Sequence, residues 1–146
     1  MAEETKQKPF DVERIYLEDA SLKLFNAPNS FALKVTPELD IGLQVDKADL
    51  AIRDYYTVSI TATIRSYLKN EDKEEDVFIL KAKETGLFHI HSLEPEVLKT
   101  VLGVTCPTII YPYLRSSVSD ILSHSTLPQV YLAQVNFEEF FKNNAE

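Results

Sequence analysis

The sequence predicts one α+β domain, a four-stranded antiparallel sheet with C-terminal helices on one face. The length of 146 residues fits a single domain, since most domains contain about 100–150 residues. Apolar and polar residues alternate through the first part of the chain, and the period becomes helical after His91. Strands followed by helices are typical of α+β folds. The links between the strands are too short or too charged to hold crossover helices, so an antiparallel meander is expected.

Four stretches have strand character: residues 10–25, 39–45, 55–64 and 77–90. A change of phase within the first stretch indicates a bulge. The second alternates most regularly, and the third is β-branched with one polar face. Residues 69–76 are charged and predict a solvated hairpin tip, while Gly86 is expected to interrupt the fourth strand with another bulge.

Three helices are expected after the strands. The first covers 94–103, with Pro95 in its first turn and Gly103 as its stop. The second follows Pro107, and Pro112 should kink it or mark its first turn. Its apolar stripe consists of Ile110, Leu114, Val118, Ile121 and Leu122. Asn136 is predicted to cap the last helix, because Glu139 stands at the capping-box position.

Composition excludes several kinds of partner. A net charge of −8 argues against binding to nucleic acid or to an anionic membrane. The sequence contains no run of about 18 apolar residues, which a membrane span would require. The N-terminus lacks the apolar region of a secretory signal. The single Cys106 cannot form an internal disulfide, which suits a reducing compartment. We therefore expect a soluble, cytoplasmic protein.

The boundaries of the folded part follow from the same patterns. Residues 1–9 are polar without a period and are expected to be a disordered lead-in. Residues 10–142 form the predicted domain, and residues 143–146 a short tail.

Catalytic chemistry is weakly represented. The three glycines are isolated, so no loop for a nucleotide or other phosphate cofactor can be assembled. His89 and His91 share a strand face and could share a metal, but no third ligand has a suitable spacing, which favours structural or solvent-facing histidines. Cys106 could act as a nucleophile with His124, although a free cysteine is more often a buried apolar residue. The sequence predicts neither an enzyme nor a cofactor.

Phenylalanines gather at two places. Phe25 and Phe31 flank an Asn-Ala-Pro-Asn turn, and the last helix carries Phe137, Phe140 and Phe141. At helical spacing such rings usually belong to a core. Three rings on one short helix are nevertheless more than one face needs, so a groove for another polypeptide is an open alternative.

Several short motifs, taken together, resemble SecB, the bacterial export chaperone, over about residues 10–141. They are Arg14-Ile15-Tyr16 with Asp19, Asn26-Ala27-Pro28, Cys106-Pro107 through Pro112-Tyr113, Leu127-Pro128-Gln129 and Val135-Asn136-Phe137. The resemblance implies a subunit that pairs, with pairs joining into a homotetramer whose helices lie between two eight-stranded sheets. It implies an ATP-independent holdase that binds unfolded preproteins and passes them to the translocation motor SecA.

The resemblance also assigns sites. It implies a client-binding groove formed by Phe25, Phe31, Val35, Ile41, Leu43, Phe137 and Phe141. It implies a SecA-docking surface that includes Asp19, Lys23 and Lys81, and an oligomer interface near Leu80, Ala82 and Glu84. Replacing Phe137 with alanine is accordingly expected to weaken client capture more than folding stability.

Three departures from the family pattern bear on these assignments. Lys23 and Lys81 stand where acidic residues usually meet SecA, Val35 replaces a tryptophan, and little chain follows Phe141. The changed charges keep open a dedicated chaperone of one partner, such as an antitoxin. A small lipid-pocket or hot-dog-like enzyme is a further alternative, although no convincing base is present.

Overall fold

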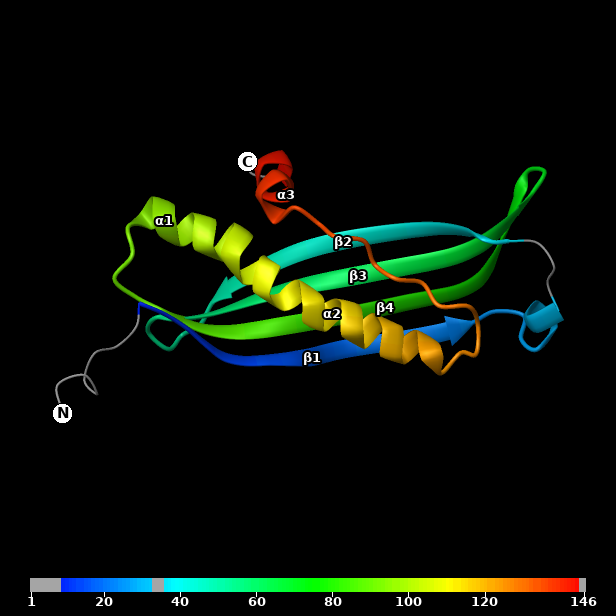
Figure 1. Cartoon of the computed structure of the whole chain (residues 1–146), viewed down its shortest axis with the longest axis horizontal. Coiled ribbons are helices and arrows are strands. Elements are labelled where there is room, and N and C mark those ends of the chain that lie inside the picture. The colour runs from blue at the N-terminus through cyan, green and yellow to red at the C-terminus, as the bar shows by residue number, and fades with distance from the viewer. Residues whose placement is uncertain (1–8, 33–35, 145–146) are drawn as a thin grey trace.

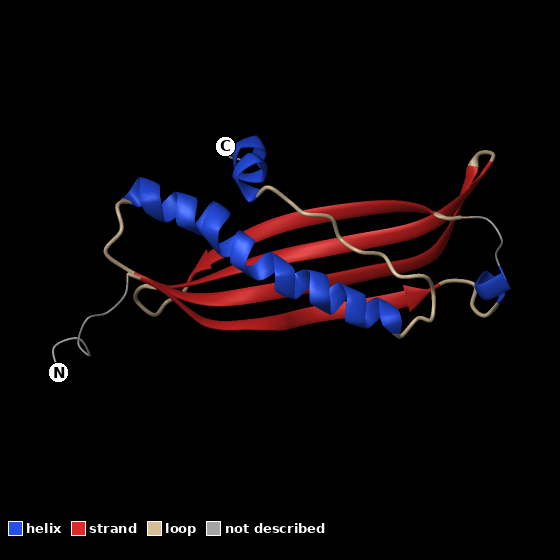
Figure 2. Cartoon of the chain, in the orientation of Figure 1, coloured by secondary structure: helices blue, strands red, loops and turns tan. Residues whose placement is uncertain are grey.

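The computed structural model describes residues 9–32 and 36–144, and shows a long, twisted sheet crossed on one face by a long helix (Figures 1 and 2). The strands are β1 (Phe10–Leu24), β2 (Glu38–Asp49), β3 (Tyr55–Asn70) and β4 (Lys73–Ile90). The helices are α1 (Pro95–Thr100), α2 (Cys106–Ser123) and α3 (Phe137–Asn144), with a 3-10 turn at Asn29–Ala32 and a π-helical turn at Val101–Thr105. The predicted α+β architecture, with its helices on one face, is confirmed.

The strand order differs from the predicted meander. It is β1-β4-β3-β2, and all neighbours are antiparallel. Strands β2, β3 and β4 do follow one another as a meander, but β1 lies at the far edge, beside β4. The connection after Leu24 therefore passes across one end of the sheet before β2 begins, as in a Greek key. The alternation of side chains along a strand does not reveal which strand is its neighbour, so the order could not be predicted from it.

Two bulges lie on β1, and the register of β3 against β4 shifts between Ser66 and Tyr67. The register of β1 against β4 shifts between Val12 and Arg14 and again between Leu17 and Asp19, which confirms the predicted change of phase. At Gly86, however, β4 continues without interruption, and the bulge expected there is wrong. A Cβ at Gly86 would lie 2.6 Å from the ring of Phe88 and 3.2 Å from Cδ1 of Ile110. The glycine is needed because a side chain would collide with the core.

The core lies between the sheet and α2. Val58, Ile60, Ala62 and Ile64 of β3 are fully buried, as the alternation predicts. From α2 the core receives Cys106, Ile110, Leu114, Val118 and Leu122, all fully buried. Burial of each large side chain contributes roughly 1.5–3 kcal/mol. Asn136 caps α3 as expected, because its Oδ1 accepts hydrogen bonds from the backbone N–H groups of Glu138 (3.0 Å) and Glu139 (3.3 Å).

Gly103 does not end a helix. The chain is helical without a break from Pro95 to Ser123, and Gly103 lies within its π-helical turn, whereas Pro112 lies inside α2 and not in a first turn. A Cβ at Gly103 would lie 2.3 Å from the ring of Phe141. The glycine thus leaves room for a ring from α3, which packs on this turn. Likewise α3 extends to Asn144, beyond the predicted domain end at residue 142.

This continuous helix is long and apolar enough, by length and composition, to cross a membrane, which the sequence did not suggest. Its inner stripe, which includes Ile110, Leu114 and Val118, is buried against the sheet. Within its most apolar window 33% of the residues are buried in the subunit, so much of its outer surface remains uncovered. Val97 and Tyr113 are half exposed on it.

Candidate functional site

A groove of about 600 Å³ lies at the end of the sheet where the connection after β1 passes. It is formed by that connection, by β2, β3 and β4, and by the segment that follows α2. The lining residues are Ser30, Phe31, Thr36, Pro37, Leu39, Ser66, Val77, Phe78, Leu127, Pro128, Gln129 and Val130. Eight of these residues are apolar and none is charged, so the groove suits an apolar segment and not a charged ligand.

The first wall of the groove is built by local hydrogen bonds. The backbone N–H of Phe25 donates to the carbonyl of Val77 (2.9 Å), which ties the connection to β4. The backbone N–H of Ser30 donates to the Asn26 carbonyl (2.9 Å), and that of Phe31 donates to the Pro28 carbonyl (3.0 Å). These bonds close the 3-10 turn at the position where the sequence predicts a turn. This turn presents the Phe31 ring with 48% of its surface exposed.

The second wall is the extended segment between α2 and α3, which runs across the helix side of the sheet (Figure 1). Ser125 Oγ donates to the Leu122 carbonyl (2.7 Å) and accepts from the N–H of Leu127 (3.0 Å). Gln129 Nε2 donates to the Ser119 carbonyl (3.2 Å), and the Tyr111 hydroxyl donates to the carbonyl of Ala133. These bonds hold Leu127 and Val130 against the groove.

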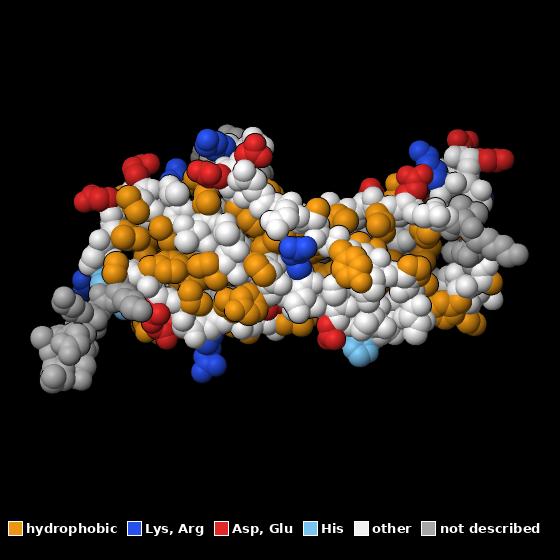
Figure 3. Space-filling view, viewed as in Figure 1, with side chains coloured by type: hydrophobic (Ala, Val, Ile, Leu, Met, Phe, Trp, Pro, Cys, Tyr) orange, Lys and Arg blue, Asp and Glu red, His pale blue; other side chains and the backbone are white. Residues whose placement is uncertain are grey.

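Apolar surface continues from the groove along β2. Leu39 and Ile41 are 44% and 46% exposed, and the next residue on this face, Leu43, packs partly against the core. Figure 3 shows hydrophobic side chains spread over this side of the molecule, with most charged groups along its outline. Exposed apolar surface of this extent, rimmed by charge, is typical of a surface that contacts another polypeptide.

The other rings expected in the groove lie elsewhere. Phe137 is 2% exposed and packs edge-on against Tyr111, with ring centroids 5.4 Å apart, so it belongs to the core of the subunit. Phe141 is half-buried against Gly103. Phe25 is half-buried beside Lys23, whose Nζ lies 5.0 Å from the ring centre. Val35 lies outside the described residues.

Sequence reasoning overlooked the groove residues contributed by Leu127, Pro128 and Val130. The Leu127-Pro128-Gln129 step entered the sequence analysis only as a motif of the family resemblance. The backbone after α2 remains extended for about ten residues, and this brings these side chains opposite Phe31 and Leu39.

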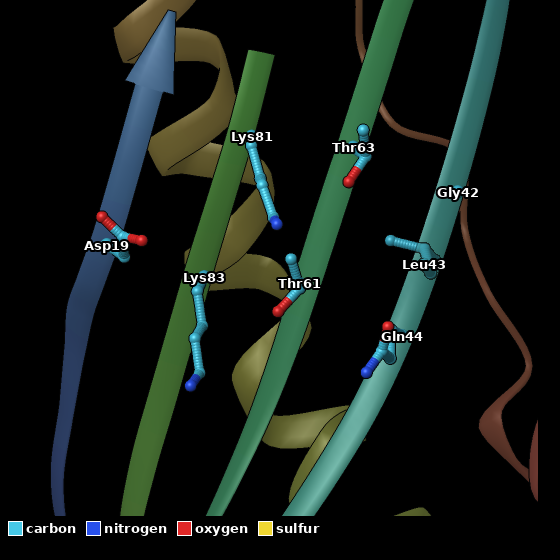
Figure 4. A pocket seen from close by; sticks show the side chains of 8 residues that line it. All are labelled: Asp19, Gly42, Leu43, Gln44, Thr61, Thr63, Lys81 and Lys83. Carbon is cyan, nitrogen blue, oxygen red and sulfur yellow. The ribbon is translucent and has the colours of Figure 1, made fainter.

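A second hollow, of about 450 Å³, lies on the open face of the sheet. Figure 4 shows its lining: Asp19, Gly42, Leu43, Gln44, Thr61, Thr63, Lys81 and Lys83. Asp19 and Lys81, both expected to dock a partner, thus border one hollow. Lys83 Nζ lies 3.4 Å from Glu18 Oε2, and Glu18 accepts a hydrogen bond from Thr85 (2.7 Å) that lowers the pKa of its carboxyl. The charges on this face are mixed.

The residues expected at an oligomer interface are enclosed in the subunit. Leu80 and Ala82 are fully buried, and Glu84 is 4% exposed, under α2. Ser117 of α2 donates a hydrogen bond to Glu84 (2.8 Å). These side chains position α2 on β4, so any effect they have on assembly acts through that packing.

The structure does not bring together Cys106 and His124, the pair considered for nucleophilic catalysis. Cys106 and His124 stand at opposite ends of α2, about 27 Å apart along the helix axis. Burial raises the pKa of the Cys106 thiol to about 12, which keeps it protonated and unreactive. Within 9–32 and 36–144, no group of three His, Cys, Asp or Glu residues is placed to hold a metal.

Comparison with known proteins agrees with this geometry. The family model described as "SecB: Preprotein translocase subunit SecB" matches residues 3–146. The chain belongs to the SecB family. A protein-export protein SecB of Methylibium petroleiphilum is 39% identical over 142 residues, covering 97% of this chain and 84% of its own length. One from Polaromonas sp. strain JS666 is 34% identical, with 97% and 91% covered.

Membership of the SecB family identifies this chain as a soluble, non-enzymatic protein-export chaperone that binds preproteins. The fold itself is shared with a solved structure, the Mycobacterium tuberculosis SecB-like chaperone Rv1957 in complex with a ChAD peptide from the Rv1956 HigA1 antitoxin. That chain has a TM-score of 0.67 and 22% identity, with 87% of this chain and 91% of the other covered. The enzyme alternative is therefore excluded.

Proposed function

We propose that this SecB chain holds unfolded preproteins in the groove beside Phe31 and Leu39, passes them to SecA, and acts as a homotetramer in the cytoplasm. The single observation that carries the proposal is a long apolar groove whose main ring, Phe31, is half exposed while the subunit core is closed. An unfolded chain presents apolar segments that such a surface can bury at about 25 cal/mol per Å².

Holding an unfolded chain needs several weak contacts. Four grooves on one assembly, engaged by one long client, raise the apparent affinity by about 10²–10⁴ over a single groove. The exposed outer surface of the helix, including Val97 and Tyr113, supports assembly through this side of the subunit. Native mass measured with and without an unfolded precursor would test both the tetramer and the number of clients bound.

Refolding arrest tests the groove directly. Wild-type protein is expected to stall the refolding of a chemically unfolded precursor, and Phe31→Ser to weaken this arrest about tenfold or more, because a buried ring is worth roughly 1.5–3 kcal/mol. Ile52→Ser is the matched control, since Ile52 is 64% exposed on the turn between β2 and β3 and does not line the groove. Equal arrest by both variants would remove Phe31 from the binding surface.

We propose the open face of the sheet as the SecA-docking surface. Asp19 and Lys81 border its hollow, and Lys23 lies on the same face, so the local charge is mixed (Figure 4). Lys81→Glu is expected to change SecA affinity several-fold at low salt, and the change should shrink as salt screens it. Lys69→Glu, at the exposed hairpin tip, is the charge-matched control. If neither Lys81→Glu nor Lys69→Glu changed the affinity for SecA, and this affinity did not depend on salt, SecA would dock elsewhere on the subunit.

The dedicated chaperone of one partner remains an outcome of these tests. If the chain arrested the refolding of only one client protein and did not bind SecA, the dedicated chaperone would be favoured. The sequence relatives favour export, because the export proteins are 34–39% identical to this chain and the antitoxin-binding neighbour 22%.

A further inference from the structure

Two imidazole rings lie next to each other at the end of β4, away from the groove and on the open face of the sheet. His89 and His91 alternate with the buried Phe88 and Ile90, so both point away from α2. Their ring centroids are 5.3 Å apart, with an interplanar angle of 50°. Tyr55 pairs with His89 across the sheet, and the two rings pack in a tilted arrangement with their centroids 4.7 Å apart.

The nitrogens of His91 differ in their surroundings. Nδ1 lies 2.9 Å from the hydroxyl of Ser92, within hydrogen-bonding distance. Nε2 is buried and has no hydrogen-bond partner among the described residues. When Nδ1 carries the proton and donates it to Ser92, Nε2 presents an unshared electron pair. A buried nitrogen of this kind calls for a ligand, because nearly all buried polar atoms in proteins are satisfied.

The local backbone holds the pair in place. The N–H of Ile90 donates to the Asp54 carbonyl and that of His91 to the Pro9 carbonyl, both at 2.9 Å. Ser92 has a positive φ of 62°, so the chain turns directly after His91 and brings the serine hydroxyl back to the ring. The two rings are therefore flanked by a strand, a tyrosine ring and a turn.

We propose that His89 and His91 form a binding site for a divalent transition-metal ion, independent of the chaperone groove. Imidazole suits Cu²⁺, Ni²⁺ and Zn²⁺. With metal–nitrogen bonds of about 2.1 Å, two imidazoles on one tetrahedral ion have their ring centres roughly 5 Å apart, close to the separation seen here. The bond between Nδ1 and Ser92 is the outer contact that usually orients a metal-binding histidine.

The site offers two protein ligands. No third His, Cys, Asp or Glu joins them in the described part of the chain, so water or an exchangeable ligand completes the coordination. Such a site binds reversibly and prefers Cu²⁺, which forms the strongest complexes among these ions. Among the residues that the structure describes, the remaining cysteine and histidine do not compete, because Cys106 is buried and His124 lies at the far end of α2 without a second ligand.

Titration of the full chain with Cu²⁺ tests the site. One ion per chain is expected, with an electron paramagnetic resonance spectrum that shows coupling to two imidazole nitrogens. Replacing either histidine, as His89→Gln or His91→Gln, should weaken binding at least about tenfold, and Ser92→Ala by about tenfold. His124→Gln should bind as tightly as wild type. Bound Cu²⁺ should also raise the melting temperature of wild type, because it binds only the folded state.

Two results would overturn the proposal. One is wild-type Cu²⁺ affinity in the His89→Gln/His91→Gln double variant. The other is a wild-type spectrum without coupling to two nitrogens, and this measurement does not depend on the folding of any variant. Refolding arrest by the metal-free chain is expected to be unchanged in both histidine variants, so failure of this site and failure of the groove are distinguishable.

Discussion

The two ends of the helix-covered face both carry phenylalanine, but the rings are placed in opposite ways. At the α3 end Phe137 is 2% exposed beneath Tyr111, and Phe141 fills the space left by Gly103. At the other end Phe31 is 48% exposed above an open groove. The difference arises from what lies opposite each ring. A ring that is covered by a helix becomes part of the core. A ring that faces only a turn and an extended segment remains accessible.

The largest expected effect comes from removing the closed ring. Phe137→Ala should lower the free energy of unfolding by about 3–5 kcal/mol, as is usual when a buried aromatic side chain is removed. Because this ring faces the core, refolding arrest should persist at temperatures where the variant is folded. Urea unfolding and refolding arrest, measured on the same preparation, check both statements. The structure thus reverses the sequence-based expectation that capture would suffer more than stability.

Phe140→Ala provides a comparison on the same helix, since its ring lies 5.8 Å from that of Phe137 but is only half-buried. Its effect on stability should be smaller. If Phe137→Ala instead abolished client capture and left the midpoint of urea unfolding unchanged, the Phe137 ring would contribute to client binding. The contrast between the closed ring at the α3 end and the open ring at the groove end would then disappear.

A smaller effect is expected where α3 meets the long helix. Gly103→Ala places a methyl group 2.3 Å from the Phe141 ring and should cost about 1–3 kcal/mol by forcing α3 away. Hydrogen exchange should increase in α3 and not in the sheet.

The double variant Gly103→Ala/Phe141→Ala identifies the cause. Without the ring, alanine at position 103 should be neutral or stabilising by up to about 1 kcal/mol relative to Phe141→Ala alone, because alanine favours helix over glycine. An equal penalty with and without the ring would show that the π-helical turn itself, and not the close contact, requires glycine.

The smallest effect on stability belongs to the open ring. Phe31→Ser should change the free energy of unfolding by less than about 0.5 kcal/mol, as is typical of exposed positions, while it weakens refolding arrest. A loss comparable to that of Phe137→Ala would mean that Phe31 is part of the fold's core in solution.

Much of the fold could be predicted from periodicity. The alternation of residues 55–64 correctly gave the buried face of β3, and the stripe from Ile110 to Leu122 gave the buried face of α2. The position of β1 beside β4 could not be predicted, because alternation describes faces and not neighbours. Glycine was misleading for a related reason. Gly86 and Gly103 leave room for neighbouring rings, Phe88 two residues along β4 and Phe141 from α3, and neither glycine has the positive φ of a turn or a helix stop.

The groove residues were assigned from the family resemblance. Among them Phe31 lines a groove and Ile41 is exposed beside it on β2, while their role in client binding stays a prediction. Phe137 was assigned to the groove by the family resemblance, whereas its helical spacing favoured the core position in which it lies. Leu127 and Val130 have no periodic signal, since an extended segment lying on other elements has no repeat of its own. The remaining assigned residues stay predictions.

Strand β2 forms one border of the sheet, next to the groove, and has backbone hydrogen-bonding groups without a neighbouring strand. It carries four acidic residues and one lysine: Glu38, Asp40, Asp46, Asp49 and Lys47. Charged side chains on such a border hinder the addition of further strands. Such a border discourages a bound polypeptide from extending the sheet into a fibre, which would protect a chaperone from aggregating together with its client.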